Sequence, residues 1–370
     1  MRLYNSMSGK VNAYQCIIRA GGGAVGRLTI HDVAIEAGVS DSTVSRALRG
    51  LDRVNPHTRA RIEDAAERLH FTFSRNASSL ASGRTMRVTL LFAGGINTWF
   101  NSCAMQGAYE VLAPEGYDIV PLITPDQAEQ DRYFEMLPGN RNTDAIIVTS
   151  FDLDKQKLEL LGGLTMPTIG LDSRSDDGYD ASVRLDENSA MLDAVRLLRS
   201  LGHHRLGYVE QPSSHEFKFS SKLRSQSFIA SARTCDYGQE DLEVFGGGHD
   251  SMPRSFDDAV SSVVATLLSD SRRPTALCVE TDDFAVALIA RLRHFGIRVP
   301  EDMTVIGFDD SRIAPVADLT TIHQDPVEMA RLAARQAVKL MKHETMDRRH
   351  ILVGTSMILR GTSAPAPSEG

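Results

Sequence analysis

Residues 29–50 read TIHDVAIEAGVSDSTVSRALRG, and this stretch predicts two short helices joined by a turn. Its first apolar residues recur at i, i+3, i+4 and i+7, which is the spacing of one helix face: Ile30, Val33, Ala34 and Ala37. Thr29 is suited to cap the start of this helix, and Gly38 follows its end. The first helix is therefore expected to end at a turn formed by residues 38–40.

A second helix is predicted from Asp41 to about Arg49, with Ser40 as its cap. Its apolar residues, Val44, Ala47 and Leu48, would face inward. Its outer face would carry small hydroxyls, a carboxylate and arginines: Asp41, Ser42, Ser45, Arg46 and Arg49. Two amphipathic helices joined by a turn with glycine are typical of a helix-turn-helix, whose second helix enters the DNA major groove. A helical hairpin that binds nothing has the same spacing.

A third helix favours the DNA-binding interpretation. Asn55-Pro56 is a helix-start signal, and apolar residues then repeat the helical spacing at Ile62, Ala65, Ala66 and Leu69. With the motifs DVA, AGVS and TVSRAL, the segment resembles the headpiece of the LacI/GalR family of bacterial transcriptional regulators, and the resemblance continues to about Arg360. The residues expected to contact DNA are Thr29, Asp41, Ser42, Thr43, Ser45, Arg46 and Asn55.

Residues 71–85, FTFSRNASSLASGRT, form a small-residue linker in which Leu80 is the conspicuous apolar residue. A helix over residues 75–82 would be too short to persist alone in water. The resemblance implies a hinge helix here, with Leu80 inserted into the DNA minor groove. The chain has Phe73-Ser74 where the family usually has Pro-Asn, and a plain interdomain linker fits the composition equally well.

Residues 1–27 have no sustained periodicity and are expected to be a disordered extension. They contain Gly21, Gly23 and Gly26 in a GxGxxG pattern. A helix-turn-helix follows instead of a βαβ unit, so this is weak evidence for a dinucleotide site. A downstream translation start near Val25 is an alternative.

The composition is that of a globular protein of two or three domains: 370 residues, 42% of them apolar. The net charge of -8 is unevenly distributed, because residues 1–87 hold 13 Lys and Arg against 7 Asp and Glu, and the rest holds 27 against 41. This asymmetry is expected of a DNA-binding head on an acidic body.

The four cysteines lie far apart, which favours reduced thiols and no metal site: Cys16, Cys103, Cys235 and Cys278. No long apolar run or secretory signal is present, so a cytoplasmic protein without a membrane span is expected. No cofactor is predicted.

From Val88 onward, short apolar runs alternate with helix-length segments. The runs lie at residues 88–92, 117–123, 144–149, 167–172, 205–209, 275–279 and 303–308. Such alternation predicts parallel sheets covered on both faces, here two doubly wound α/β subdomains with a ligand cleft between them. The resemblance implies a periplasmic-binding-protein-like body with crossovers near Leu185, Ile322 and His350.

The expected organisation follows from these patterns. The chain divides into an extension (1–27), a helix-turn-helix domain (28–73), a hinge (74–85), an effector-binding domain (86–360) and a tail (361–370). Within the effector-binding domain, the N-subdomain takes residues 86–185 and 323–350, and the C-subdomain takes residues 186–322 and 351–360.

Carboxylates follow several predicted strands. Asp172 follows IGL, Asp282 follows LCVET, and Asp309 and Asp310 follow VIGF. Each alone fits a helix cap or a loop, but together they would face one cleft. The resemblance implies that Asp172, Asp309 and Arg224 bind a ligand, and carboxylates with a guanidinium group suit a sugar or polyol.

Further candidate effector-binding residues come from the same resemblance. Trp99 is the only tryptophan and would cover a sugar ring, although a core or dimer-interface role fits equally. Thr281 stands where the family often has asparagine. With Asp282 and Gln324 these complete the expected effector-binding set.

The sequence thus predicts a transcriptional regulator, most simply a repressor of carbohydrate-utilisation genes. It would bind a pseudo-palindromic operator as a homodimer and respond to a sugar-like effector. An enzyme that uses paired carboxylates, as in glycoside hydrolysis, or a pure sugar-binding module is the alternative. Neither needs a basic three-helix head.

Overall fold

The computed structural model describes residues 28–48, 54–71, 84–139, 142–164, 166–212, 217–246 and 255–367. The chain divides into two compact units, Met1–Gly83 and Arg84–Gly370, which we call the headpiece and the body. The predicted extension (1–27) and residues 74–83 of the predicted hinge, Leu80 among them, lie outside the described residues. Among the described residues, no helix has both the length and the apolar character needed to cross a membrane.

The headpiece contains the three predicted helices, which are α1 (Ile30–Ala37), α2 (Asp41–Leu48) and α3 (Pro56–Arg68). They enclose the predicted small core, in which Val33, Val44, Ile62 and Ala65 are fully buried or nearly so. Gly38 ends α1 with a positive φ of 62°, a conformation that glycine adopts without steric cost.

Side chains also join the ends of these helices. Asp32 accepts hydrogen bonds from the backbone nitrogen and hydroxyl of Thr29 at the start of α1. From α3, Arg61 donates to the Ala37 carbonyl and Arg59 to the Ala47 carbonyl. These two arginines satisfy carbonyls at the C-terminal ends of α1 and α2, where no helical partner remains.

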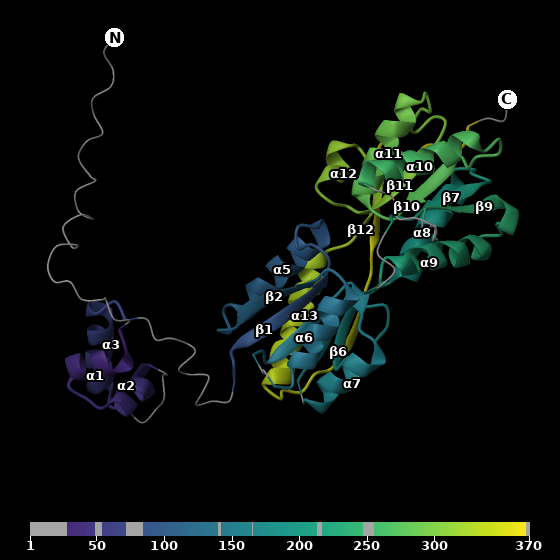
Figure 1. Ribbon diagram of the computed structural model, residues 1–370. Coiled ribbons are helices and arrows are strands. Elements are labelled where there is room, and N and C mark those ends of the chain that lie inside the picture. The colour runs from purple at the N-terminus through teal and green to yellow at the C-terminus, as the bar shows by residue number, and fades with distance from the viewer. Residues whose placement is uncertain are drawn as a thin grey trace, which may run out of the picture. The chain divides into compact units, whose positions relative to one another are not determined.

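The body has two lobes, each built on a six-stranded sheet (Figure 1). The sheet of the N-lobe is parallel throughout its described residues, in the order β13 (His350–Val353), β6 (Ala181–Leu185), β5 (Thr168–Leu171), β3 (Ala145–Thr149), β1 (Arg87–Ala93) and β2 (Asp118–Thr124). The sheet of the C-lobe has the order β14 (Ser356–Ile358), β12 (Thr320–His323), β11 (Thr304–Asp309), β10 (Ala276–Val279), β7 (Leu206–Val209) and β9 (Leu242–Phe245). In this second sheet only the described edge strand β14 is antiparallel.

Helices cover both faces of each sheet. The N-lobe helices are α5 (Trp99–Leu112), α6 (Gln127–Met136), α7 (Lys155–Gly163) and α13 (Pro326–Met341). The C-lobe helices are α8 (Glu187–Ser200), α9 (Lys222–Thr234), α10 (Phe256–Ser269), α11 (Asp282–His294) and the short α12 (Ile313–Val316), with a 3-10 turn at Gln239–Asp241. Successive side chains of a strand therefore pack on opposite faces of the sheet. Leu90 packs with α5 and α13, and Leu91 packs with Phe134 of α6.

The chain crosses between the lobes where β6, β12 and β13 end. The first two crossovers agree with the predicted positions near Leu185 and Ile322. The third was predicted near His350 and lies later, because β13 (His350–Val353) pairs with β6 in the N-lobe before β14 joins the C-lobe. The boundary expected at residue 350 is corrected accordingly.

The segment expected to be a tail is also corrected over its described part. Thr362 is 1% exposed and donates to the Val305 carbonyl. His203 contacts the Ala364 carbonyl oxygen, and the Ala366 nitrogen donates to Leu201. Residues 361–367 thus pack against the C-lobe, which the polar composition of GTSAPAP did not indicate.

A small antiparallel ladder joins the lobes beside the cleft. Strand β4 (Phe151–Asp152) continues from β3, and it pairs with β8 (Lys218–Phe219), which precedes α9. Phe217 packs with Phe151 in the apolar cluster of the N-lobe. This ladder brings Ser220 to the carboxyl end of the N-lobe sheet.

Candidate effector-binding cleft and DNA-reading helix

A cavity of about 470 Å³ lies where the carboxyl ends of the strands of the two lobes meet. This volume falls in the range of about 300–1,000 Å³ that is usual for small-molecule sites. Five predicted residues line it: Asp172, Arg224, Thr281, Asp309 and Gln324. Their roles in ligand binding remain proposals.

Several residues around the cavity have a positive φ, a backbone conformation that is unfavourable for residues with a Cβ. Ser150, Asp172 and Asp309, which follow or end strands, have φ values of 61°, 54° and 120°. For residues with a Cβ such values cost free energy, and they cluster at functional sites. The sheets therefore hold these side chains at the cavity at some cost to stability.

Arg224 is the central cation of the cleft. It projects from α9, and its side chain is 4% exposed. Its Nε donates to Glu187 Oε1 at 3.0 Å, and its Nη1 donates to the Glu280 carbonyl at 2.7 Å and lies 3.8 Å from Asp309 Oδ1. Because these neighbours lie in the C-lobe, the guanidinium group is fixed to that lobe before any ligand binds.

Glu187 was not among the predicted site residues. It is the first residue of α8, directly after the first crossover, and its Oε2 is buried with no hydrogen-bond partner among the described residues. Burial raises the pKa of Glu187 to about 7 despite the opposing attraction of Arg224. Its pairing with Arg224 depends on the packing of α8 against α9, which no local motif indicates.

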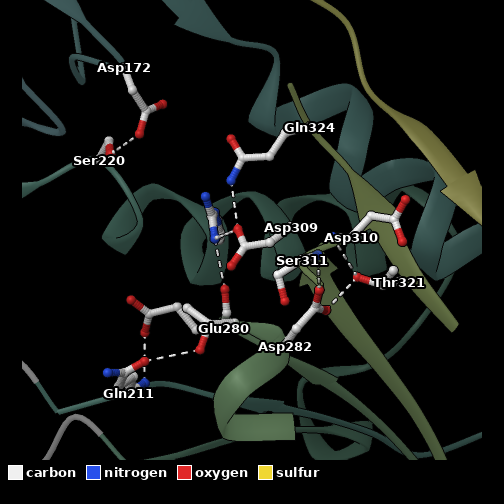
Figure 2. A network of polar contacts seen from close by, with 12 residues as sticks. Asp172, Gln211, Ser220, Glu280, Asp282, Asp309, Asp310, Ser311, Thr321 and Gln324 are labelled. Carbon is white, nitrogen blue, oxygen red and sulfur yellow. Dashed lines mark hydrogen bonds and ion pairs between the residues drawn. The ribbon is translucent and has the colours of Figure 1, made fainter. Parts of the chain in front are cut away.

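Asp172 faces the cleft from the N-lobe. Its Oδ2 accepts hydrogen bonds from Ser220 at 2.7 Å and Ser150 at 3.3 Å, and burial raises its pKa against the attraction of Arg224 (Figure 2). Since Ser220 belongs to the segment that leads into α9, this contact joins the two lobes. Ser220 also escaped the sequence analysis, although it lies four residues before Arg224.

Asp309 and Gln324 form a second polar pair in the cavity. Gln324 Nε2 donates to Asp309 Oδ1 at 2.6 Å, and Figure 2 shows the two side chains turned toward each other. Burial raises the pKa of Asp309 well above its ordinary value. Gln324 Oε1 is buried and has no hydrogen-bond partner within the described part of the chain.

Thr281 combines the two roles considered for strand-end residues. Its hydroxyl caps α11 by accepting from the Phe284 nitrogen, and it donates to Gln211 Oε1 at 3.0 Å. Gln211 lines the cavity and is held by Glu280, which also binds Lys222 at 2.9 Å (Figure 2). Gln211 was missed because it follows β7 in a loop without a recognisable motif.

Two predicted effector residues are not placed in the cavity lining. Asp282 is 0% exposed, and it accepts from the Ser311 backbone nitrogen and the Thr321 hydroxyl. Burial raises its pKa to about 6. Figure 2 shows it turned toward these partners, so its geometry fits the alternative of a loop-bracing carboxylate.

Trp99 is also absent from the lining, where its neighbour Phe100 takes the aromatic position. Both residues lie in the first turn of α5, and successive residues on a helix point about 100° apart. A direct contact of Trp99 with a ligand stays a prediction, whereas Phe100 lines the cavity. Phe217 and Phe219 add further aromatic lining.

No group of three or more His, Cys, Asp or Glu side chains suited to hold a metal ion occurs in the described ranges.

In the headpiece, most of the predicted DNA-contacting residues lie on α2. Asp41, Ser42 and Arg46 are exposed, and Arg46 lies along the helix with its Nε donating to the Ser42 carbonyl at 3.1 Å. Ser40 Oγ contacts the hydroxyls of Ser42 and Thr43. The remaining predicted DNA contacts among the described residues are Thr29, Ser45 and Asn55.

Two of these residues also have a structural role at the start of a helix. Thr29 begins α1, and Asn55 caps α3 by accepting from the His57 nitrogen at 2.9 Å. Both remain partly or fully accessible at the surface. A DNA contact by either would therefore add to its capping role.

Two family models match the chain. Residues 29–74 match the model of bacterial regulatory proteins of the lacI family, and residues 195–363 match a periplasmic binding protein-like domain. The catabolite control protein A of Priestia megaterium is 29% identical over 86% of this chain and 94% of its own length. The transcriptional repressor CytR of Escherichia coli K12 is 27% identical over 92% of this chain and 97% of its own.

Solved structures agree on the fold. The lac repressor dimer bound to operator and the anti-inducer ONPF aligns with a TM-score of 0.78 and 22% identity, covering 91% of this chain and 99% of that one.

Proposed function

The chain belongs to the LacI family of bacterial regulatory proteins, and on that premise we propose that it represses carbohydrate-utilisation genes in response to a sugar-like effector. The protein acts in the cytoplasm as a homodimer on a pseudo-palindromic operator, and the proposal assigns it no enzymatic reaction. The observation that carries the proposal is the cleft, where a preorganised cation and two carboxylates meet beside aromatic side chains.

The chemistry of the cleft suits a polyhydroxylated ligand. Hydroxyl groups both donate and accept hydrogen bonds, so they satisfy the carboxylate of Asp172, the free Gln324 Oε1 and the guanidinium of Arg224 together. Phe100 and Phe219 supply apolar faces for a sugar ring. Solved relatives support this class, because one is a complex of the regulator CelR with cellobiose.

DNA recognition falls to the headpiece. One helix-turn-helix reads one half-site, so two-fold protein symmetry is matched to two-fold operator symmetry. Arg46 is the strongest candidate for base contact, since an exposed arginine on the recognition helix is suited to bidentate binding of guanine. Ser42 and Asp41 are exposed in the first turn of the same helix.

The experiment that tests the proposal is a gel shift with the full-length protein and duplex DNA from upstream of its own gene. We expect a discrete complex that survives excess scrambled competitor at physiological salt. Sedimentation should show a dimer at micromolar concentration. Equal competition by scrambled DNA, or a stable monomer that still binds the operator, would refute the proposal.

A further inference from the structure

The recognition helix carries a carboxylate at its first turn, and this carboxylate is held by a residue of another helix. His31 of α1 lies with Nδ1 at 3.1 Å from Asp41 Oδ1 and 3.3 Å from Oδ2. The side chains are 67% and 58% exposed, so the pair contributes little to folding. In the structure this contact turns the Asp41 carboxylate toward Nδ1 of His31.

Arg46, the arginine of the same helix, does not hold the Asp41 carboxylate. Arg46 Nε donates to the Ser42 carbonyl, and its Nη2 lies 3.4 Å from Ser42 Oγ. Arg46 and Ser42 are one helical turn apart and share a face. The carboxylate of Asp41 and the guanidinium of Arg46 are therefore presented as separate groups.

An ionised carboxylate only accepts hydrogen bonds. In the major groove guanine presents acceptors, and thymine presents an acceptor and a methyl group. Adenine presents the N6 amino donor beside the N7 acceptor, whereas cytosine presents the N4 amino donor that Asp and Glu accept. A negative charge beside phosphates also lowers general affinity for DNA. Such a residue therefore contributes selectivity by rejecting bases that present an acceptor to it, which are guanine, thymine and, through N7, adenine.

We propose that Asp41 selects a cytosine amino group in each operator half-site, and that His31 is the positioning residue that aims its carboxylate. The inference rests on the proposed function, because it takes α2 to be the helix in the major groove. The recognition of DNA would then include the identity of one base pair and a second helix, α1, that takes part in reading it.

The test is selection of binding sites from a randomised duplex library with full-length protein. The wild-type protein should enrich cytosine at one position in each half-site. Asp41→Asn should shift that position toward adenine, which asparagine binds through N6 and N7, and should lose about 5- to 150-fold discrimination for cytosine. Preferences at the other positions should stay unchanged.

His31 is tested by a pair of variants. His31→Ala should reduce the cytosine preference severalfold, and His31→Gln, which retains a donor, should restore part of it. Glu36→Gln is the matched control, because Glu36 is an exposed carboxylate of α1 that pairs with Arg68 at 3.1 Å. It should leave every base preference unaltered, and melting curves should show that all the variants fold.

The outcomes separate this inference from the proposed function. Failure of the wild-type protein to enrich any sequence would refute both. An enriched operator whose preferences are unchanged by Asp41→Asn would refute the cytosine contact alone. If Asp41→Asn acts and His31→Ala matches the wild-type protein, the positioning role of His31 is refuted.

Discussion

The guanidinium carbon of Arg224 lies 3.6 Å from the centre of the Phe308 ring, so an aromatic face covers the buried cation of the cleft. Phe308 belongs to β11, whose last residue is Asp309. One strand therefore supplies both the ring under the cation and a carboxylate beside it. This arrangement fixes Arg224 without occupying all of its donors.

Removing Arg224 should abolish the effector response. Arg224→Ala leaves Glu187 and Asp309 buried near each other without their cation, so the free energy of unfolding should also fall by about 3–5 kcal/mol. Calorimetry with the effector and chemical denaturation measure the two effects. Arg233→Ala, an exposed position later in α9, is the control and should change neither. Intact effector affinity in Arg224→Ala would disprove the assigned cleft.

Glu187 should make stability depend on pH. Its folded pKa of about 7 lies above its ordinary value of 4.5, so the folded state retains a proton that the unfolded state releases between these values. The stabilisation is complete below about pH 4.5 and is lost as the pH rises through about 7. The shift corresponds to about 3 kcal/mol.

Urea unfolding between pH 4.5 and 8 measures this dependence. The difference between the wild-type protein and Glu187→Gln removes contributions from Asp172, Asp282 and Asp309, whose pKa values are also raised. The wild-type protein should lose stability relative to the variant as the pH rises. Parallel pH profiles would show that Glu187 is not buried as the structure has it.

The operator contact that we propose for Arg46 should be separable from effector binding. Arg46→Ala should weaken operator binding by about 1–3 kcal/mol, or roughly 5- to 150-fold, because a bidentate contact to guanine is lost. Fluorescence anisotropy at physiological salt measures the change. Arg68→Ala removes an equal charge from α3, where Arg68 pairs with Glu36, and it should cost less. An unaltered affinity in Arg46→Ala would refute its assignment to the reading face.

Gly107 tests the packing of the N-lobe. A Cβ at Gly107 in α5 would meet the Val327 carbonyl oxygen and approach Ala330 Cβ of α13 to 2.9 Å. Gly107→Ala should therefore destabilise the body by about 1–3 kcal/mol through overpacking. Gly162→Ala in α7 has no atom within 4 Å of its Cβ and should be neutral or slightly stabilising. Equal melting temperatures for both variants would contradict the close approach of α5 and α13.

The sequence was sufficient to predict the helices and strands, but not the side-chain contacts between them. The run at residues 303–308 became β11 (Thr304–Asp309) with Asp309 at its carboxyl end, because apolar periodicity reports local burial. Glu187 and Ser220 were missed, since their partners Arg224 and Asp172 lie 37 and 48 residues away. Asp282 follows β10 as predicted, but neither Asp282 nor Trp99 lines the cavity, because the direction of a side chain depends on its neighbours.

We propose a coupling between the body and the headpiece, in which a ligand bound in the cleft of the body changes the affinity of the headpiece for DNA. Its most direct test is the operator dissociation constant of the full-length protein, measured by anisotropy without and with a saturating effector. We predict a change of roughly 5- to 150-fold, which corresponds to a coupling free energy of about 1–3 kcal/mol, and no change in Asp172→Ala at the same concentration. An operator affinity that is the same with and without bound effector in the wild-type protein would contradict the account.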